Sequence, residues 1–169
     1  MRKYHAKKLE KEAMYPYEPW KITENEFLIE NNHHNEAIFA LGNGYMGIRG
    51  TYEEDYPGGK DTTTPGFYIN GVYAQEDIIY GETAPNLPTE GQTMLNLADW
   101  SEINLYINEE KLDLLKGNLH SYERELDMKQ GVSRRELIWE DRQGRKVEIK
   151  ITRLISLSRE HIAAVRYKV

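Results

Sequence analysis

Four glycines lie within nine residues of this 169-residue chain, at Gly42, Gly44, Gly47 and Gly50. Glycine reaches backbone conformations with φ > 0 at little steric cost, and it lets another backbone come close. It also loses more conformational entropy on folding than any other residue. A run this dense therefore predicts a tightly folded turn with a structural role, in which at least two of the four glycines have φ > 0 or lie against a neighbouring backbone.

The glycine run contains a GxGxxG match from Gly42 to Gly47. A dinucleotide site with this motif needs a strand before it and a helix after it, because the helix N-terminus holds the pyrophosphate. Residues 36–41 could supply the strand. The helix is excluded, because Gly50 and then Pro57–Gly59 would interrupt it. The sequence therefore argues against a nucleotide site.

After Trp20 the chain consists of short alternating runs separated by turn residues, a pattern typical of β-strands. Val132–Trp139 predicts one strand, residues 141–144 a turn, and residues 146–151 a second strand with alternating apolar and charged side chains. These segments predict a hairpin with one buried face and one charged face.

Two further segments, Ile103–Ile107 and Ile162–Val169, alternate in the same way, and no sustained helical period follows residue 20. We therefore predict an all-β fold, an antiparallel β-sandwich, preceded by a tail or short helix over residues 1–19. The chain stops at Val169 inside a strand pattern, which leads us to expect that residues 20–169 are the first part of a truncated sandwich.

Composition narrows the classes of partner. The net charge of −6 argues against nucleic acid or an anionic membrane surface. The chain has no cysteine, and therefore no disulfide, thiolate nucleophile or cysteine metal site. No apolar run is long enough for a membrane span, and the N-terminus has no secretory h-region. We expect a cytoplasmic protein.

Several segments, taken together and in order, carry a family resemblance. They are Trp20–Ile22, the glycine run Leu41–Glu54, Gly66–Tyr73, Tyr80–Glu82, Gln92–Leu97, Arg124–Gly131 and Arg153–Leu157. The chain from about Trp20 to its last residue resembles the N-terminal β-sandwich of glycoside hydrolase family 65. That family contains the inverting phosphorylases of maltose, trehalose, kojibiose and nigerose.

The resemblance implies a much longer parent protein. Family members begin with a large β super-sandwich, followed by a helical linker, an (α/α)6 catalytic barrel and a small C-terminal β domain. A glutamic acid in the barrel protonates the glycosidic oxygen while inorganic phosphate attacks the anomeric carbon from the opposite face. No cofactor is implied beyond phosphate as co-substrate. The catalytic residues would lie in the barrel, so none is assigned here.

Two alternatives stay open beside an inert N-terminal domain of a disaccharide phosphorylase. The chain could be a free-standing carbohydrate-binding or oligomerisation module, or it could belong to a hydrolase of the family. The resemblance further implies a homodimer, and partners in the protein's own barrel and a disaccharide. Which disaccharide is used is not decided by these residues, because specificity would lie in barrel loops.

The candidate site residues lie in and after the glycine run. We predict that this loop, with Asn43, Tyr45 and Arg49, faces the barrel near the substrate entrance. Adjacent carboxylates at Glu53 and Glu54 favour salt bridges or a solvated turn over an acid–base pair, because neighbours in a strand point to opposite faces. Arg49 is suited to bind phosphate or carboxylate, but an ion pair with Glu53, Glu54 or Asp55 is the more ordinary role.

For two further groups of residues, a histidine pair and a set of aromatic residues, we predict a structural role. His33 and His34 have no third ligand at a recognisable spacing, so we predict a loop with capping roles and no metal. A set of aromatic residues could stack on sugar rings, but core packing is the simpler role, because these residues share no spacing that would place them on one face. The set comprises Tyr68, Tyr73, Tyr80, Trp100, Tyr106 and Trp139.

Overall fold

The computed structural model describes residues 13–54, 56–82 and 84–169. Strands dominate it, and the prediction of an antiparallel all-β fold is confirmed. The strands are β1 Lys21–Glu24, β2 Leu41–Gly42, β3 Met46–Ile48, β4 Phe67–Ile69, β5 Tyr73–Asp77, β6 Glu90–Met94, β7 Tyr106–Ile107, β8 Glu110–Lys111, β9 Asn118–Asp127, β10 Val132–Glu140, β11 Lys146–Ile155 and β12 Ala163–Lys168. Helix α2 spans Asn32–Ile38, and single 3-10 turns cover Ile29–Asn31 and Gly59–Asp61.

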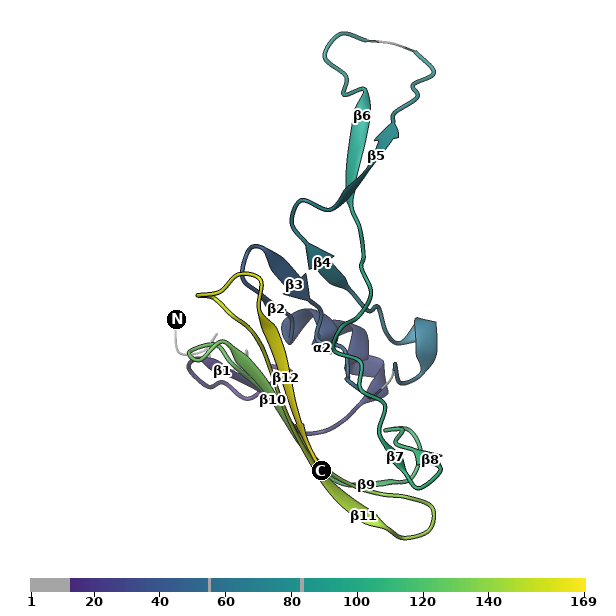
Figure 1. The fold of residues 1–169 in the computed structure, drawn as a ribbon, viewed down its shortest axis with the longest axis vertical. Helices are drawn as coiled ribbons and strands as arrows, with labels where there is room; N and C mark the ends of the chain where they lie inside the picture. Colours follow the sequence, from purple (N-terminus) through teal and green to yellow (C-terminus); the bar gives the residue numbers. More distant parts are fainter. Residues whose placement is uncertain (1–12, 55, 83) are drawn as a thin grey trace, which may run out of the picture.

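A five-stranded antiparallel sheet in the order β1-β9-β10-β11-β12 forms the body of the molecule (Figure 1). The predicted hairpin is confirmed as β10 and β11, which pair from Val132 opposite Leu154 to Glu140 opposite Lys146. Its turn is closed by Asp141, whose side chain accepts hydrogen bonds from the backbone N–H groups of Gln143 and Arg145. The predicted C-terminal strand is present as β12, at the edge of this sheet.

The inner face of the sheet is covered by other parts of the chain, which gives two hydrophobic clusters. The larger one gathers side chains of β9, β10 and β11 with Tyr52 and Leu112, and Trp139 at its centre is fully buried. The smaller one joins the three-stranded sheet β2-β3-β4 to the end of β11 at Ile155. Chain segments on both sides of the clusters thus make the layered arrangement that a sandwich requires.

The segment around His33 is a helix, so its prediction as a loop was wrong. Helix α2 buries Asn32, Asn35 and Glu36, all of them polar. A helix is detected in a sequence by the period of its apolar residues, and here the buried side carries amides and a carboxylate instead. Its burial is stabilised by hydrogen bonds rather than by apolar contact, which explains why the pattern gave no sign of it.

Two other predicted segments differ in extent. Only Tyr106 and Ile107 of the alternating run at residues 103–107 are in a strand, paired with β8 in a small hairpin. Residues 13–19 of the predicted N-terminal tail form bends, an isolated bridge and a turn without a helix, and the remainder of that tail lies outside the described residues.

Strands β5 and β6 form a hairpin arm that projects away from the body, at the top of Figure 1. They pair in register from Tyr73 opposite Met94 to Asp77 opposite Glu90. Neither hydrophobic cluster contains a residue of this arm. The arm is therefore held by its own ladder and by its attachment to β4.

Candidate functional site

The glycine run folds as the β2–β3 hairpin, and its tip is fastened to the turn between β11 and β12. Asn43 accepts hydrogen bonds from the backbone N–H groups of Tyr45 and Met46 at 3.0 and 2.9 Å. Its side-chain amide donates to the carbonyl oxygens of Ser156 and Glu160 at 2.8 and 2.9 Å. The Tyr45 ring meets the His161 ring edge-on, with 4.3 Å between centroids. Asn43 and Tyr45 thus position the loop against the five-stranded sheet.

The glycine run has the backbone geometry that the sequence predicted, and its structural role stays a prediction. Gly44 has a φ of 89°, a conformation that residues with a Cβ rarely adopt. Gly50 lies against the chain: a Cβ there would stand 2.9 Å from the carbonyl carbon of Phe39 and 2.8 Å from the Arg124 guanidinium. A Cβ on Gly42 would lie 3.4 Å from the carbonyl oxygen of Met46, whereas Gly47 has more room.

Arg49 forms its ion pair with Glu36 of helix α2 rather than with Glu53 or Glu54; Asp55 lies outside the described residues. The Arg49 Nη2 atom lies 3.5 Å from Glu36 Oε2 and donates to the carbonyl oxygen of His33 at 3.3 Å. Glu36 is fully buried and also accepts from the backbone N–H of Thr64 at 2.8 Å. The pairing differs from prediction because the helix, which the sequence did not reveal, brings this carboxylate beside the loop.

Three arginines occupy inward-facing positions on neighbouring strands of the sheet. Arg124 on β9 stands directly opposite Arg135 on β10, and Arg153 on β11 points into the same face. All three are almost completely buried. Like charges directly opposite one another destabilise a sheet, and a buried unpaired charge is costly, so the covering segment must supply anions.

Glu53 and Glu54 supply these anions. The prediction that they form salt bridges is confirmed, and because both are buried they do not form a solvated turn. Arg135 Nη2 donates to Glu53 at 2.9 Å and also to Glu54. Arg153 lies 3.5 Å from the other oxygen of Glu53, and the Tyr167 hydroxyl donates to Glu54 at 2.8 Å. The side chains of Glu53 and Glu54 both point toward the inner face of the sheet, because these two residues form a bend rather than a strand.

The protonation of the network follows from its partners. Burial alone would raise the pKa of Glu53, but Arg153 and Arg135 outweigh burial and lower the pKa. Burial also opposes the charge on Arg135, yet Glu54 and Glu53 raise its pKa. Glu53 and Arg135 are therefore held as an ion pair at neutral pH.

A hydroxyl pair links this network to a third carboxylate on β1. The hydroxyls of Tyr52 and Tyr122 lie 3.0 Å apart, and Tyr122 donates to Glu24 at 2.9 Å. Burial raises the pKa of Glu24, an effect that Arg124 partly offsets. The Arg124 guanidinium lies over the Phe39 and Tyr52 rings, 4.4 and 5.0 Å from their centroids, which adds cation–π attraction.

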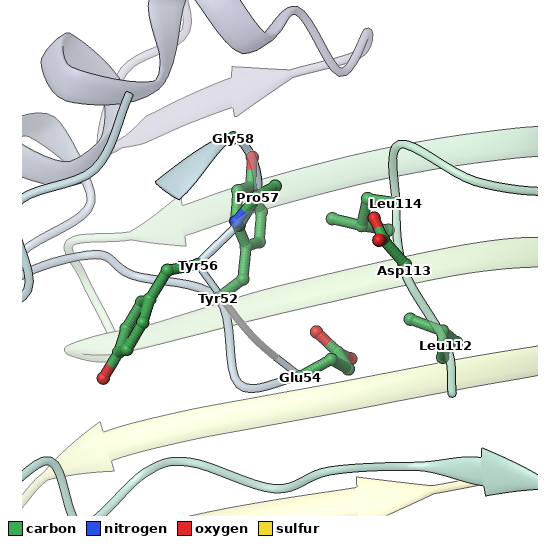
Figure 2. Close-up of a pocket in the computed structure, with 8 residues that line it drawn as sticks. All are labelled: Tyr52, Glu54, Tyr56, Pro57, Gly58, Leu112, Asp113 and Leu114. Atoms are coloured by element: carbon green, nitrogen blue, oxygen red, sulfur yellow. The ribbon is translucent and has the colours of Figure 1, made fainter. Parts of the chain in front are cut away.

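The network has the properties of a structural element. Its carboxylates are buried and engaged with arginines or hydroxyls, so none is free to act as an acid on a sugar. The cavity beside Glu54 has a volume of about 60 Å³ and lies between Tyr52, Glu54 and residues 56–58 on one side and residues 112–114 on the other (Figure 2). Small-molecule sites are several times larger, so this cavity has room for water and not for a disaccharide.

Sequence reasoning found Glu53 and Glu54 but missed Arg124, Arg135 and Arg153. A signal was present: Arg135 and Arg153 alternate with outward-facing residues on strands whose other inward positions are apolar except for Ser133. A cation at an inward position of an amphipathic strand needs a buried anion. That rule predicts a buried anion opposite these strands, and the structure identifies it as the acidic pair that follows the glycine run.

The remaining candidates do not converge on one place. His33 is hydrogen-bonded to Thr64 and to the carbonyl oxygen of Asp61, at 3.2 and 3.1 Å. Within residues 13–54, 56–82 and 84–169, no three histidine, cysteine or acidic side chains gather as a metal site. Of the aromatic set, Trp139 is in the core, whereas Tyr73 and Tyr106 are exposed on different hairpins. None of the helices found among the described residues has the length and apolarity that crossing a membrane requires.

Comparison with known proteins supplies the family. The model of the glycosyl hydrolase family 65 N-terminal domain matches residues 22–169. The chain is 48% identical to the alpha,alpha-trehalose phosphorylase of Thermoanaerobacter brockii over 157 residues, which are 93% of this chain and 20% of that protein. It is 32% identical to the maltose phosphorylase of Bacillus subtilis, again over 93% of this chain and 20% of the relative.

A solved structure, described as "Putative kojibiose phosphorylase from human microbiome", superposes with a TM-score of 0.73 at 31% identity. The match covers 83% of this chain and 18% of that one. The chain thus spans about a fifth of the length of the relatives it matches. It belongs to glycosyl hydrolase family 65 and represents the N-terminal domain of that family.

Proposed function

We propose that this chain is the non-catalytic N-terminal domain of a longer inverting disaccharide phosphorylase. The whole protein would convert an α-glucosyl disaccharide and inorganic phosphate to β-glucose 1-phosphate and glucose. The observation that carries the proposal is the match over 93% of this chain to a trehalose phosphorylase that is about five times longer. The buried, neutralised carboxylates of the sheet agree with it, because an inverting reaction needs a free carboxylic acid beside the substrate.

Trehalose is the substrate we would test first, since identity is 48% to the trehalose enzyme of T. brockii and 34% to the kojibiose phosphorylase of the same organism. Phosphate would be the nucleophile, and the reaction needs no further cofactor. We also propose a cytoplasmic homodimer, which membership of this phosphorylase family favours.

The test uses the full-length protein that contains this domain. Incubation with phosphate and trehalose, maltose, kojibiose or nigerose should yield β-glucose 1-phosphate from one of them, and the chain of 169 residues should yield none. Release of glucose without phosphate would favour the hydrolase alternative. Tight binding of sugar by the short chain, without turnover in the long one, would favour a carbohydrate-binding module.

The position of the glycine loop at the substrate entrance stays a proposal. Arg49 is the residue to test, since its side chain is 28% exposed while Asn43, Glu53 and Glu54 are occupied within the fold. In the full-length protein, Arg49→Ala should lower kcat/KM without unfolding the domain, and Arg49→Lys should restore part of it if charge alone is needed. Unchanged kinetics in both variants would leave Arg49 with only its ion pair to Glu36.

A further inference from the structure

The β5–β6 arm has an unusual composition for a segment so exposed. None of its described residues between positions 73 and 95 is buried. Six large apolar side chains on it are exposed, Ile79 to 93%. They are Tyr73, Ile78, Ile79, Leu87, Met94 and Leu95. A two-stranded hairpin without a core is marginally stable in water, and a large exposed apolar surface is typical of an interaction site. Both features suggest that another protein surface packs against this hairpin.

The charge of the arm is one-sided. No lysine or arginine lies between Lys60 and Lys111, whereas nine of the 28 acidic residues do. Four of these acidic residues lie on the arm itself, at residues 73–95, and the other parts of the chain hold 24 acidic residues and all 22 basic ones. The arm thus carries only negative charge, whereas the other parts of the chain have nearly equal numbers of acidic and basic residues.

The register of the hairpin concentrates this charge at one place. Asp77 and Glu90 are direct cross-strand partners, so their carboxylates lie on the same face, and neither has an ion pair among the described residues. Like charges directly opposite one another destabilise a hairpin. Tyr73 and Met94, the directly paired residues at the base, share that face. This face is therefore complementary to a surface with an apolar patch next to lysine or arginine side chains.

The base of the arm is firmly fixed, which sets its direction. The backbone N–H of Leu97 donates to the carbonyl oxygen of Phe67 at 2.8 Å. The Asn96 side chain accepts from the Phe67 N–H and donates to the Pro65 carbonyl oxygen, both at 2.9 Å. The arm is presented rigidly from β4, as a docking element would be.

We infer that this arm docks on the part of the protein's own chain that follows residue 169, through the face of Tyr73, Asp77, Glu90 and Met94 and the exposed Ile79. The inference rests on the proposed function, because it takes the chain to be one domain of a longer protein. The relatives place about four fifths of their length outside the matched region, so a large covering surface is connected to every copy of this domain. The docking site carries lysine or arginine side chains around an apolar patch.

A second copy of this domain fits the arm less well. At the opposite end of the body an open groove of about 710 Å³ is lined by Lys111, Lys116, Arg142 and Arg145 with two acids and two amides. This groove could meet the carboxylates of the arm. Its lining has no apolar side chain, so it would leave the exposed isoleucine and methionine of the arm uncovered.

Zero-length cross-linking of carboxylates to lysines tests the inference in the full-length protein. The arm suits this chemistry, because it has several carboxylates and no lysine to confuse the assignment. A mixture of isotopically light and heavy protein separates links within one chain from links between two. We expect links within one chain from Asp77 or Glu90 to lysines beyond residue 169. Links between chains, or links only to lysines of residues 1–169, would overturn the inference.

A substitution provides an independent readout. Ile79→Asp in the full-length protein should speed amide exchange of residues 73–95 at least several-fold, because it places a charge in the docked surface. Leu157→Asp is the matched control, since Leu157 is 78% exposed on another turn. Equal exchange of the arm in both variants and in wild type would overturn the docking. Turnover of the wild-type protein is measured separately, so a phosphorylase without the expected cross-links would refute the docking and leave the proposed function standing.

Discussion

The inner face of the five-stranded sheet and the β5–β6 arm both carry charge at high density, but they handle it in opposite ways. On the sheet, Arg135 stands between two buried carboxylates that neutralise it. On the arm, Asp77 and Glu90 face each other, and neither forms an ion pair within the part of the chain that the structure describes. The charges on the sheet are neutralised within this domain, and their ion pairs hold the covering segment against the sheet. The pair on the arm has no neutralising cation within the described residues, as the docking that we propose for the arm would require.

The largest effect should come from breaking the buried network at Arg135. Arg135→Met leaves Glu53 and Glu54 as buried carboxylates without their shared cation, so we expect a loss of about 3–5 kcal/mol in the free energy of unfolding. Arg134→Met is the matched control on the same strand, because its side chain is 33% exposed and its pairs are on the outer face. The control should cost no more than about 1 kcal/mol in urea unfolding. Similar losses in both variants would show that the network contributes no more than a surface ion pair.

A second comparison uses glycines from the two regions. Gly50→Ala drives a methyl group into Phe39 and Arg124, and should cost about 1–3 kcal/mol of stability. Gly81 lies in the loop of the arm, with nothing within 4 Å of an added Cβ and no positive φ. Gly81→Ala should leave stability unchanged or raise it by up to about 1 kcal/mol. Thermal unfolding of the two variants measures the difference, and a neutral Gly50→Ala would contradict the close approach seen at the glycine run.

The pH dependence separates two carboxylates of the buried network. The folded-state pKa of Glu53 is lowered, chiefly by Arg153 against the effect of burial, so its stabilisation is present above 4.5 and is lost as the pH falls through its folded pKa. The folded-state pKa of Glu24 is raised by burial, so its contribution is present below 4.5 and is lost as the pH rises through its folded pKa.

Urea unfolding over a pH series that brackets 4.5, the ordinary pKa of both groups, measures these opposite slopes. Glu53→Gln should reduce the loss of stability in acid, whereas Glu24→Gln should reduce the loss on the alkaline side of 4.5. If both substitutions changed the pH dependence of the unfolding free energy in the same direction, Glu24 would ionise as readily as Glu53. Burial of Glu24 would then have no effect on its pKa.

Much of the fold could be predicted from the sequence, and the features that were not predicted share one physical cause. The β10–β11 hairpin was predicted because apolar and charged residues alternate regularly along it. Helix α2 and the partners of Glu53 were not predicted, because polar groups form the buried contacts there. Asn35 and Arg135 resemble surface residues in a hydropathy pattern, and only a structure shows which buried partner satisfies each. The entrance role of Arg49 stays a prediction, since the surface that it would face lies outside the described residues.

The smallest expected effect tests whether the arm is incomplete in this domain alone. Asp77→Asn removes the repulsion between Asp77 and Glu90 and should stabilise the isolated hairpin by about 0.2–1 kcal/mol. The amide of Ile78, which donates to the Thr89 carbonyl oxygen at 2.9 Å, should then exchange up to several-fold more slowly in the chain of 169 residues. Glu82→Gln is the control, because it removes one negative charge from the loop of the arm without changing a directly opposed pair.

Equal slowing in both variants would mean that the overall negative charge of the arm, rather than the opposed pair, sets its stability. The full-length protein should respond to Asp77→Asn with the opposite sign. There the carboxylate would have a basic partner, and losing it should make Ile78 exchange faster. A change of sign between the short and the long chain is the sharpest distinction available, because a surface complete by itself would respond alike in both.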